Sequence, residues 1–404
     1  MASSLRSRMR TLAALTRSSF RGYDDYDYEA IEPAAFVPLG HAMEKPRVNL
    51  VVPTLEKRSV FGGVSTALDL LDRFSLLGYD TRVVCTKSII DPVDRCSKYA
   101  MQNCDDASVV HAAMTSLGDA RRISVGADDW FICTLWTTYA VFCGAKEFAQ
   151  RTFGVHRPLI YMIQDFEPGF YEWSSNYMFA EQTYRDPETI AVINSHELCA
   201  YLHAAGYAFK SEYCFEPHLN KALRAKLDAD YSKQKIVLCY GRPRTPRNCF
   251  PTIVGALRIL LEEHPEAREW QFLSAGATFS DVTLAEGVVL RAVGKLSLED
   301  YADLLRRTSV GLSLMCSPHP SYPPLEMATF GAWTVTNRFE SKDLSAYSPY
   351  ILSVDGGSII SVANAVYDAM CKYEPRLRVQ VNDSYVNGDG ELDEIAAVIA
   401  REHF

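Results

Sequence analysis

Three arginines crowd together where an apolar run ends near the middle of the chain. Residues 235–240, KIVLCY, have the composition of a buried strand, and Arg242, Arg244 and Arg247 follow directly. A loop that leaves the C-terminal end of a parallel strand faces the crevice in which open α/β sheets bind ligands. Guanidinium groups match phosphate oxygens geometrically, and an anion would offset the repulsion between them. The loop therefore predicts an anion site.

A further cation of the same kind lies later in the chain. Lys295 follows a strand-like run, and Ser297 with Asp300 forms a capping box, so a helix begins just beyond the lysine. One such cation alone is typical of a solvated loop. Because Arg242, Arg247 and Lys295 all stand at strand exits of one predicted domain, we expect them to converge on one anionic ligand.

A proline-led helix start offers a third contact for an anion. Pro323 and Pro324 fix the first turn of a predicted helix, and the next amides, those of Leu325 and Glu326, are expected to face a phosphate. The Glu326 carboxylate would accept hydrogen bonds from hydroxyl groups such as those of a ribose. The alternative interpretation of Glu326 is a first-turn acid that only complements the helix dipole.

Two residue pairs in the first half of the chain can also contact a substrate. Gly62 and Gly63 stand before a predicted helix, where they either place backbone amides near an anion or allow close packing of strand and helix. Asp165 lies at the end of a strand-like run, 158–166, and Glu167 directly follows that run. Paired carboxylates just past a strand can act as acid and base. The alternative for this pair is loop carboxylates that cap backbone amides.

Strands and helices that could position these residues alternate along the chain in two successive series. Two such series predict two Rossmann-like α/β domains with parallel sheets. The expected division is a flexible leader, 1–45, basic and then acidic; an N-terminal domain, 46–215; a C-terminal domain, 216–380; and a segment, 381–404, that packs back on the N-terminal domain. The strand-like runs are 48–55, 79–85, 130–136, 158–166, 189–195, 235–240, 270–276, 287–294, 310–317, 333–337 and 350–355.

Composition argues against several classes of function. The chain has 404 residues and a formal net charge of -9, so no basic surface for nucleic acid is expected. It has no run of about 18 apolar residues, which argues against a transmembrane helix. The 11 cysteines include no C-x-x-C pair, which favours reduced thiols in a cytoplasm over disulfides or a zinc site. The arginine-rich arm, 1–22, could contact anionic lipid at the inner face of the cell membrane, the alternative being a disordered terminus.

Several of these motifs resemble one class of glycosyltransferase. The loop GRPRTPRN is similar to the G-R-x4-K-G loop of retaining glycosyltransferases of family 4, with Arg247 in place of the lysine and Asn248 in place of the glycine. The segments IQDFEPGFY, NSHEL, GRPRTPRNCF and SYPPLEMATFG resemble more closely the WsaF rhamnosyltransferases, which build surface-layer glycan from dTDP-L-rhamnose. The resemblance extends over roughly residues 45–400, and its motifs are specific together although each is weak alone.

The resemblance implies a GT-B fold, in which the C-terminal domain holds a nucleotide sugar and the N-terminal domain binds the acceptor across a cleft. It implies that Arg242 and Lys295 neutralise the donor diphosphate, with Arg247 as a further candidate. Tyr322 would approach the same diphosphate, and Glu326 would bind the ribose. No metal ion or other cofactor is required, because fixed cations and helix dipoles stabilise the charge of the leaving nucleoside diphosphate.

Two departures from the family pattern fall at positions that contact the sugar. The first glutamate of the family pattern is Pro318 here, and the family's His-Asp pair is Gln164-Asp165. We expect Gln164 and Asp165 to line the sugar pocket, and the loss of polar contacts fits a 6-deoxy sugar. His319 cannot be assumed to replace the missing glutamate.

The expected activity is therefore retaining transfer of a deoxyhexose, L-rhamnose from dTDP-L-rhamnose, onto a surface polysaccharide or a lipid-linked saccharide in the cytoplasm. The expected partners are this nucleotide sugar and this acceptor, with a homodimer as an open alternative. A nucleotide-sugar epimerase would share the GT-B fold, although the family 4 loop speaks against it. A catalytically silent sugar-binding or scaffold protein is the alternative without catalysis, which the changes at Pro318 and Gln164 suggest.

Overall fold

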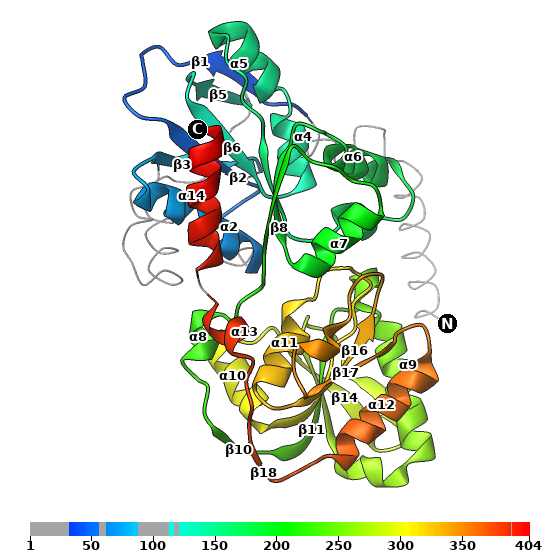
Figure 1. Ribbon diagram of the computed structural model, residues 1–404. Coiled ribbons are helices and arrows are strands. Elements are labelled where there is room, and N and C mark those ends of the chain that lie inside the picture. The colour runs from blue at the N-terminus through cyan, green and yellow to red at the C-terminus, as the bar shows by residue number, and fades with distance from the viewer. Residues whose placement is uncertain (1–31, 56–61, 88–112, 117–120, 389) are drawn as a thin grey trace, which may run out of the picture.

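Two α/β bodies, each built on a seven-stranded sheet, make up the described part of the chain (Figure 1). The computed structural model describes residues 32–55, 62–87, 113–116, 121–388 and 390–404. The arginine-rich arm, residues 1–22, lies outside the described residues, so its expected contact with lipid stays a prediction. Among the described helices, none combines the length and the apolar character that crossing a membrane requires.

The first sheet is entirely parallel, in the order β4-β3-β2-β6-β7-β8-β9. Strands β6 to β8 are buried along their whole length, and sequences such as IYMI and IAVIN are apolar nearly throughout for that reason. The strands are β2 (Arg47–Val52), β3 (Asp80–Cys85), β4 (Ala113–Ser116), β6 (Asp129–Cys133), β7 (Ile160–Ile163), β8 (Ile190–Asn194) and β9 (Ser211–Phe215). The helical segments are α2 (Gly62–Leu76), α4 (Trp136–Phe142), α5 (Ala145–Phe153), η3 (Glu167–Phe170), α6 (Ser175–Tyr184) and α7 (His196–Ala204).

The second sheet has the order β13-β14-β12-β11-β15-β16-β17, and only β13 and β14 pair in antiparallel fashion. Its strands are β11 (Gln234–Gly241), β12 (Gln271–Gly276), β13 (Val282–Ala285), β14 (Val288–Gly294), β15 (Thr308–Leu312), β16 (Trp333–Arg338) and β17 (Ile351–Asp355). A small antiparallel pair joins β10 (Asp230–Ser232) to β18 (Arg376–Arg378). The helical segments are α8 (Lys221–Arg224), η4 (Pro246–Asn248), α9 (Phe250–Glu263), η5 (Pro265–Glu269), α10 (Leu298–Arg307), α11 (Tyr322–Thr329), η6 (Leu344–Ala346), α12 (Ile359–Cys371) and α13 (Asp383–Asn387).

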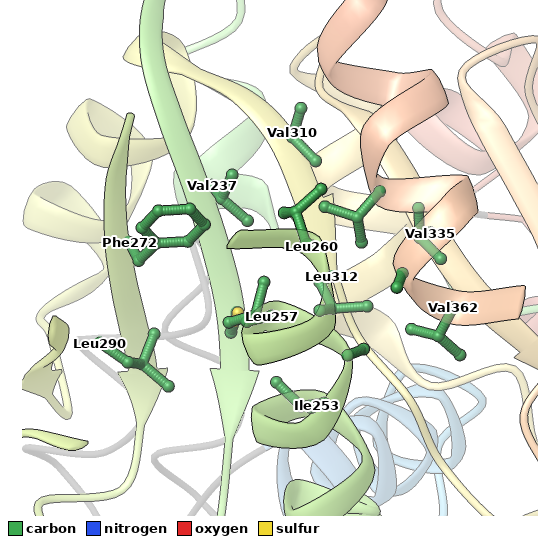
Figure 2. Close-up of a cluster of buried hydrophobic side chains, with 14 of the residues drawn as sticks. Val237, Ile253, Leu257, Leu260, Phe272, Leu290, Val310, Leu312, Val335 and Val362 are labelled. Atoms are coloured by element: carbon green, nitrogen blue, oxygen red, sulfur yellow. The ribbon is translucent and has the colours of Figure 1, made fainter. Parts of the chain in front are cut away.

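Helix α9 is fixed to the second sheet by an apolar core (Figure 2). Its residues Ile253, Leu257 and Leu260 are buried in one cluster with Val237 of β11 and Val310 of β15. Removal of apolar surface from water stabilises such a contact by about 25 cal/mol per Å². Because α9 and β11 flank the arginine loop, their packing fixes both ends of that loop.

The C-terminal segment returns to the first domain. Helix α14 (Glu391–His403) packs on α2, and its Leu392, Ile395 and Ile399 lie in the buried cluster of the first sheet. Phe404 stacks on Trp130 of β6, with ring centroids 4.4 Å apart. The chain thus passes between the domains twice, once after β9 and once before α14, and both passages lie on the same side of the molecule (Figure 1).

Strand structure begins ahead of residue 46, within the stretch expected to be a flexible leader. Strand β1 (Ala35–Pro38) pairs in parallel with β5 (Arg122–Val125) as a separate two-stranded sheet. Phe36 packs edge-on against Phe142 of α4, with ring centroids 5.6 Å apart. A four-residue strand is too short to show a period in the sequence, and the contact that stabilises it comes from residues far along the chain.

Candidate functional site

The arginine loop after β11 is closed by one of its own side chains. Asn248 is fully buried; its Oδ1 accepts a hydrogen bond from the Arg242 amide at 2.6 Å, and its Nδ2 donates to the Tyr240 carbonyl at 3.0 Å. Asn248 stands where the family loop has glycine, and its two bonds hold the turn together. The side chains of Arg242 and Arg244 are exposed, whereas that of Arg247 is half-buried.

Arg242 and Glu326 lie near the same tyrosine. Burial raises the pKa of Tyr240; Arg242 lowers that pKa electrostatically and Glu326 raises it. The strand exit and the start of α11 are thus neighbours in space. Lys295 is exposed at the exit of β14, and α10 begins just beyond it with Ser297 as the predicted cap.

Glu326 is a desolvated acid of the second domain. Burial raises the pKa of its carboxyl to about 7, and the neighbouring Tyr301 hydroxyl acts in the opposite direction. A carboxylate removed from water gains from any ligand group that donates a hydrogen bond to it. The expected contact of Glu326 with hydroxyl groups of a ligand stays a prediction.

The start of α11 has both prolines in its first turn, as expected, but the amides that follow them are not free. The helix begins at Tyr322, and Ser321 is its cap residue. The cap's carbonyl accepts the first intrahelical bond, from the amide four residues later, so the amides of Leu325 and Glu326 are already engaged within the helix. The prediction that these two amides face a phosphate is wrong for that reason.

One backbone amide at the start of α11 can still donate a hydrogen bond to an anion. Pro323 and Pro324 have no N–H, and the Ser321 amide donates to Nδ1 of His319 at 3.0 Å. The Tyr322 amide is the first-turn donor that remains. The Tyr322 side chain is held at the domain boundary, where its hydroxyl accepts a hydrogen bond from Nδ2 of Asn194 at 3.0 Å.

His319 is a buried donor that the sequence analysis did not place in the site. Because Nδ1 accepts the Ser321 amide, the neutral ring carries its proton on Nε2. Burial lowers the pKa of His319 to about 4, so the ring is neutral at physiological pH. Its Nε2 is buried and has no hydrogen-bond partner among the described residues. The signal in the sequence was its position next to Pro318, where the family glutamate is missing.

Asp165 connects the two domains. Its carboxylate accepts hydrogen bonds from the Arg247 guanidinium and the Ser317 hydroxyl, both in the second domain, and from the Phe166 amide at 2.9 Å. Asp165 follows β7, Arg247 lies beyond β11 and Ser317 lies beyond β15. The C-terminal ends of the two sheets therefore face each other here.

Arg247 contacts two residues of the first domain. It pairs with Asp165, and its Cζ lies 3.7 Å from the centre of the Phe170 ring. A guanidinium has five N–H donors, so this arrangement leaves some of them for a ligand. The expected contact of Arg247 with a diphosphate stays a prediction.

A pocket of about 420 Å³ lies beside the Asp165–Arg247 pair. Its volume lies in the range of small-molecule sites, roughly 300–1,000 Å³. Loops of both domains line it, and Pro318 is among the lining residues, so the position of the missing family glutamate does border the pocket. The lining includes Asp165, Phe170, Tyr201, Arg247, Ser317 and Pro318.

The glycine pair and Gln164 meet at the start of α2. Nε2 of Gln164 donates to the Gly63 carbonyl at 2.7 Å, and the Gln164 side chain fills the space that a Cβ on residue 63 would need. Gly62 is the first residue of α2. The structure thus gives Gly63 a packing role, one of the two alternatives that the sequence left open.

Glu167 serves the fold of the loop after β7. It is buried, and its Oε2 accepts the Trp136 amide at 2.7 Å. Burial raises the pKa of Glu167 to about 8, and the bond from Trp136 partly offsets this effect. Asp165 faces the pocket and Glu167 faces the core, so the structure does not bring them together as an acid–base pair.

Comparison with known proteins supports this architecture. A family model of the WsaF N-terminal domain matches residues 47–196, and one of the WsaF C-terminal domain matches residues 235–367. The O-antigen biosynthesis protein RfbC of Myxococcus xanthus is 33% identical over 177 residues, which are 44% of this chain and 14% of that protein. The chain thus matches a small part of this relative's length.

Solved structures share the fold at low sequence identity. Sucrose-phosphate synthase from Thermosynechococcus elongatus superposes with a TM-score of 0.57 and 12% identity over 88% of this chain and 99% of that one. HepE of Anabaena, in complex with UDP and glucose, has a TM-score of 0.58 and 11% identity over 88% and 99% of the two chains. The two domain matches and the shared architecture establish that the chain belongs to the WsaF family and has the GT-B fold of glycosyltransferases.

Proposed function

We propose that this chain transfers a deoxyhexose, L-rhamnose from dTDP-L-rhamnose, with retention of configuration. The observation that carries the proposal is the pocket between the domains, with Asp165 of the first domain on one side and Arg247, beyond β11 of the second sheet, on the other. The acceptor we propose is a surface polysaccharide or a lipid-linked saccharide, which agrees with the name of the Myxococcus xanthus relative. A cytoplasmic position at the inner face of the membrane belongs to the same proposal.

The second domain supplies the groups that a nucleoside diphosphate needs. Arg242 and Lys295 would hold the diphosphate, the Tyr322 amide would donate to it, and Glu326 would accept from the sugar of the nucleoside. As the bond between the transferred sugar's C1 and the phosphate oxygen breaks, negative charge builds on that oxygen, and fixed cations stabilise it without a metal.

The proton balance needs no side-chain base. The acceptor hydroxyl attacks C1 from the face that the phosphate leaves, the new C1–O bond forms as the old one breaks, and the proton of the hydroxyl passes to the departing phosphate. Asp165 would then position the sugar indirectly, by holding the loops that line the pocket. His319 would donate through its Nε2 to an oxygen of the donor, since that proton has no partner in the described protein.

The acceptor side has an exposed aromatic surface close to the pocket. Trp173 is 94% exposed, and Met178 and Phe179 of α6 are exposed as well. Trp173 follows η3, whose last residue, Phe170, lines the pocket. We propose that this surface stacks on sugar rings of the acceptor.

Replacing Arg242 or Lys295 by alanine tests the diphosphate contact. Each change removes a fixed cation from the leaving group, which should lower kcat by about 100- to 1000-fold. Arg244→Ala is the matched control: it lies in the same exposed loop, matches no cationic position of the family, and should stay within a few-fold of the parent. Steady-state kinetics measures the rates, and circular dichroism checks folding. Equal losses in all three variants would point to a diffuse cationic patch instead.

Nucleotide preference tests the donor. Thermal shift with dTDP, UDP, GDP and CDP at equal concentration should show the largest stabilisation with dTDP, because the nucleotide with the lowest Kd stabilises the folded state most. A ligand at about 100 times its Kd stabilises it by about 2.7 kcal/mol. The same series on Glu326→Gln shows whether the shift depends on the proposed site. A clear preference for GDP or CDP would contradict the rhamnose donor.

His319→Asn tests the orphaned donor. An asparagine oxygen can take the place of Nδ1 and keep the bond from the Ser321 amide, while the Nε2 proton is lost. We expect kcat to fall by about 10- to 100-fold, because a hydrogen bond to a charged group contributes about 1.5–3 kcal/mol. His319→Gln, which carries an amide N–H₂ toward the Nε2 position, should recover part of the rate. Parent-like kinetics in His319→Asn would remove His319 from the site.

Trp173→Ala tests the acceptor surface. The KM for the acceptor should rise by about ten-fold, equivalent to about 1.4 kcal/mol, while hydrolysis of the donor in the absence of acceptor stays unchanged. Ile360→Ala, a change at an exposed apolar residue of α12 in the other domain, is the control. An unchanged acceptor KM would place acceptor binding elsewhere.

A further inference from the structure

Four side chains of metal-binding type gather at the edge of the first sheet. Cys199 and His203 lie four residues apart on α7, and Glu212 and Cys214 lie two residues apart on β9. Residues with these spacings share one face of a helix and one face of a strand. Tyr213, between the two strand residues, bonds instead to Glu402 of α14 through its hydroxyl, at 2.7 Å.

Three of these residues already offer ligand atoms that lie close together. The atoms offered by Cys199, His203 and Glu212 are all within 4.8 Å of one another. The Cys199 Sγ and the His203 Nε2 are 3.9 Å apart, and the same Nε2 contacts a Glu212 carboxylate oxygen. Cys214 lies two residues from Glu212 on the same face of β9, and its thiol is a neighbour of the Cys199 thiol. Sulfur and nitrogen ligands at about 2.3 and 2.05 Å from a tetrahedral zinc ion are about 3.6 Å apart, close to the observed 3.9 Å.

The burial of the cluster fits a site that a metal enters from solvent. Cys199 is 8% exposed, whereas the His203 side chain is 54% exposed. The chain also contains a His–Glu pair of the ordinary surface kind, His156 with Glu188, at 3.3 Å. The His203–Glu212 pair differs from it because the thiol of Cys199 lies beside the imidazole, 3.9 Å from Nε2.

We propose that Cys199, His203, Glu212 and Cys214 form a structural zinc site. Four protein ligands complete a tetrahedral shell and leave no position for water, which distinguishes a structural zinc from a catalytic one. To admit the ion, His203 and Glu212 separate from each other and each bonds to the metal. In the spacing C-x3-H-x8-E-x-C, the first two ligands lie on a helix and the last two on a strand. A search for C-x-x-C pairs therefore does not find this site.

A zinc ion at this position would fasten α7 to the edge strand β9. Helix α7 carries Tyr201, which lines the pocket, and the carbonyl of Glu197, which accepts a hydrogen bond from the Ser341 hydroxyl of the second domain at 2.6 Å. The metal would thus stabilise one wall of the pocket without taking part in the transfer. The site is independent of the proposed donor and acceptor.

Metal analysis of the full-length chain tests the site directly. The protein is purified without chelator and analysed by plasma mass spectrometry, and we expect one zinc ion per chain. Replacement by Co²⁺ should give the intense visible bands of tetrahedral cobalt and a thiolate-to-cobalt charge-transfer band in the near ultraviolet. Less than stoichiometric zinc after incubation with Zn²⁺ and desalting, or a cobalt spectrum without thiolate bands, would overturn the proposal.

Two variants assign the ligands. His203→Ala removes an exposed ligand and should fold normally. Its zinc affinity is measured by competition with a chromogenic chelator. Loss of an outer-shell partner lowers metal affinity by about 10- to 100-fold, and loss of this direct ligand should lower it further. Cys214→Ser should abolish the charge-transfer contribution of one thiolate. His156→Ala is the matched control and should bind zinc like the parent. Equal affinity of His203→Ala and the parent would show that the ion binds elsewhere and would refute the site.

Discussion

The carboxylate of Asp165 holds loops from three strands of two different sheets. It accepts from Arg247 beyond β11 and from Ser317 beyond β15, while its own backbone follows β7. Breaking a buried ion pair costs about 3–5 kcal/mol because it leaves a charge unpaired, and this pair, about one fifth exposed on each side, is screened only partly. The same three loops line the pocket between the domains. The shape of the pocket therefore depends on this one carboxylate.

The helices that begin at the cleft share a backbone feature. Ser195, Cys249 and Ser321 are the cap residues of α7, α9 and α11, and each has a positive φ, of 98°, 54° and 68°. A non-glycine residue in such a conformation costs on the order of 1–3 kcal/mol and persists where surrounding contacts fix it. Here the contacts are those of the helices with the sheets behind them.

Glu167, which is buried, and Glu326, which is half-buried, show how the environment of a carboxyl decides its role. Burial raises the pKa of both, to about 8 for Glu167 and to about 7 for Glu326. Glu167 accepts the Trp136 amide and lies in the core of the first domain, so its acceptor capacity serves the loop after β7. Glu326 lies at the start of α11, near Tyr240 and Arg242 at the exit of β11. The same side chain thus supports the fold in one domain and is available to a ligand in the other.

The sequence by itself determined the two α/β domains, the central strands and the position of the arginine loop. Unbroken apolar runs such as IAVIN mark strands buried on both faces, and helix α2 begins at the glycine pair and ends before Gly78, whose φ is 92°. These features depend on neighbours along the chain, which is why a pattern can reveal them. Strand β1 has too few residues to show a period, and its pairing with β5 and the packing of Phe36 on Phe142 stabilise it.

Only the tertiary structure decided which of these residues meet. Arg242 and Arg247 are five positions apart in one loop, yet one is exposed and the other pairs across the domains with Asp165. The amide of Leu325 is engaged within α11 because the helix begins at Tyr322, with Ser321 as its cap. Nε2 of His319 has no hydrogen-bond partner in the described part of the chain. The cluster around Cys199 depends on short distances between side chains of a helix and a strand. Such contacts join residues that are remote in sequence or depend on the direction of a side chain, and neither leaves a local pattern.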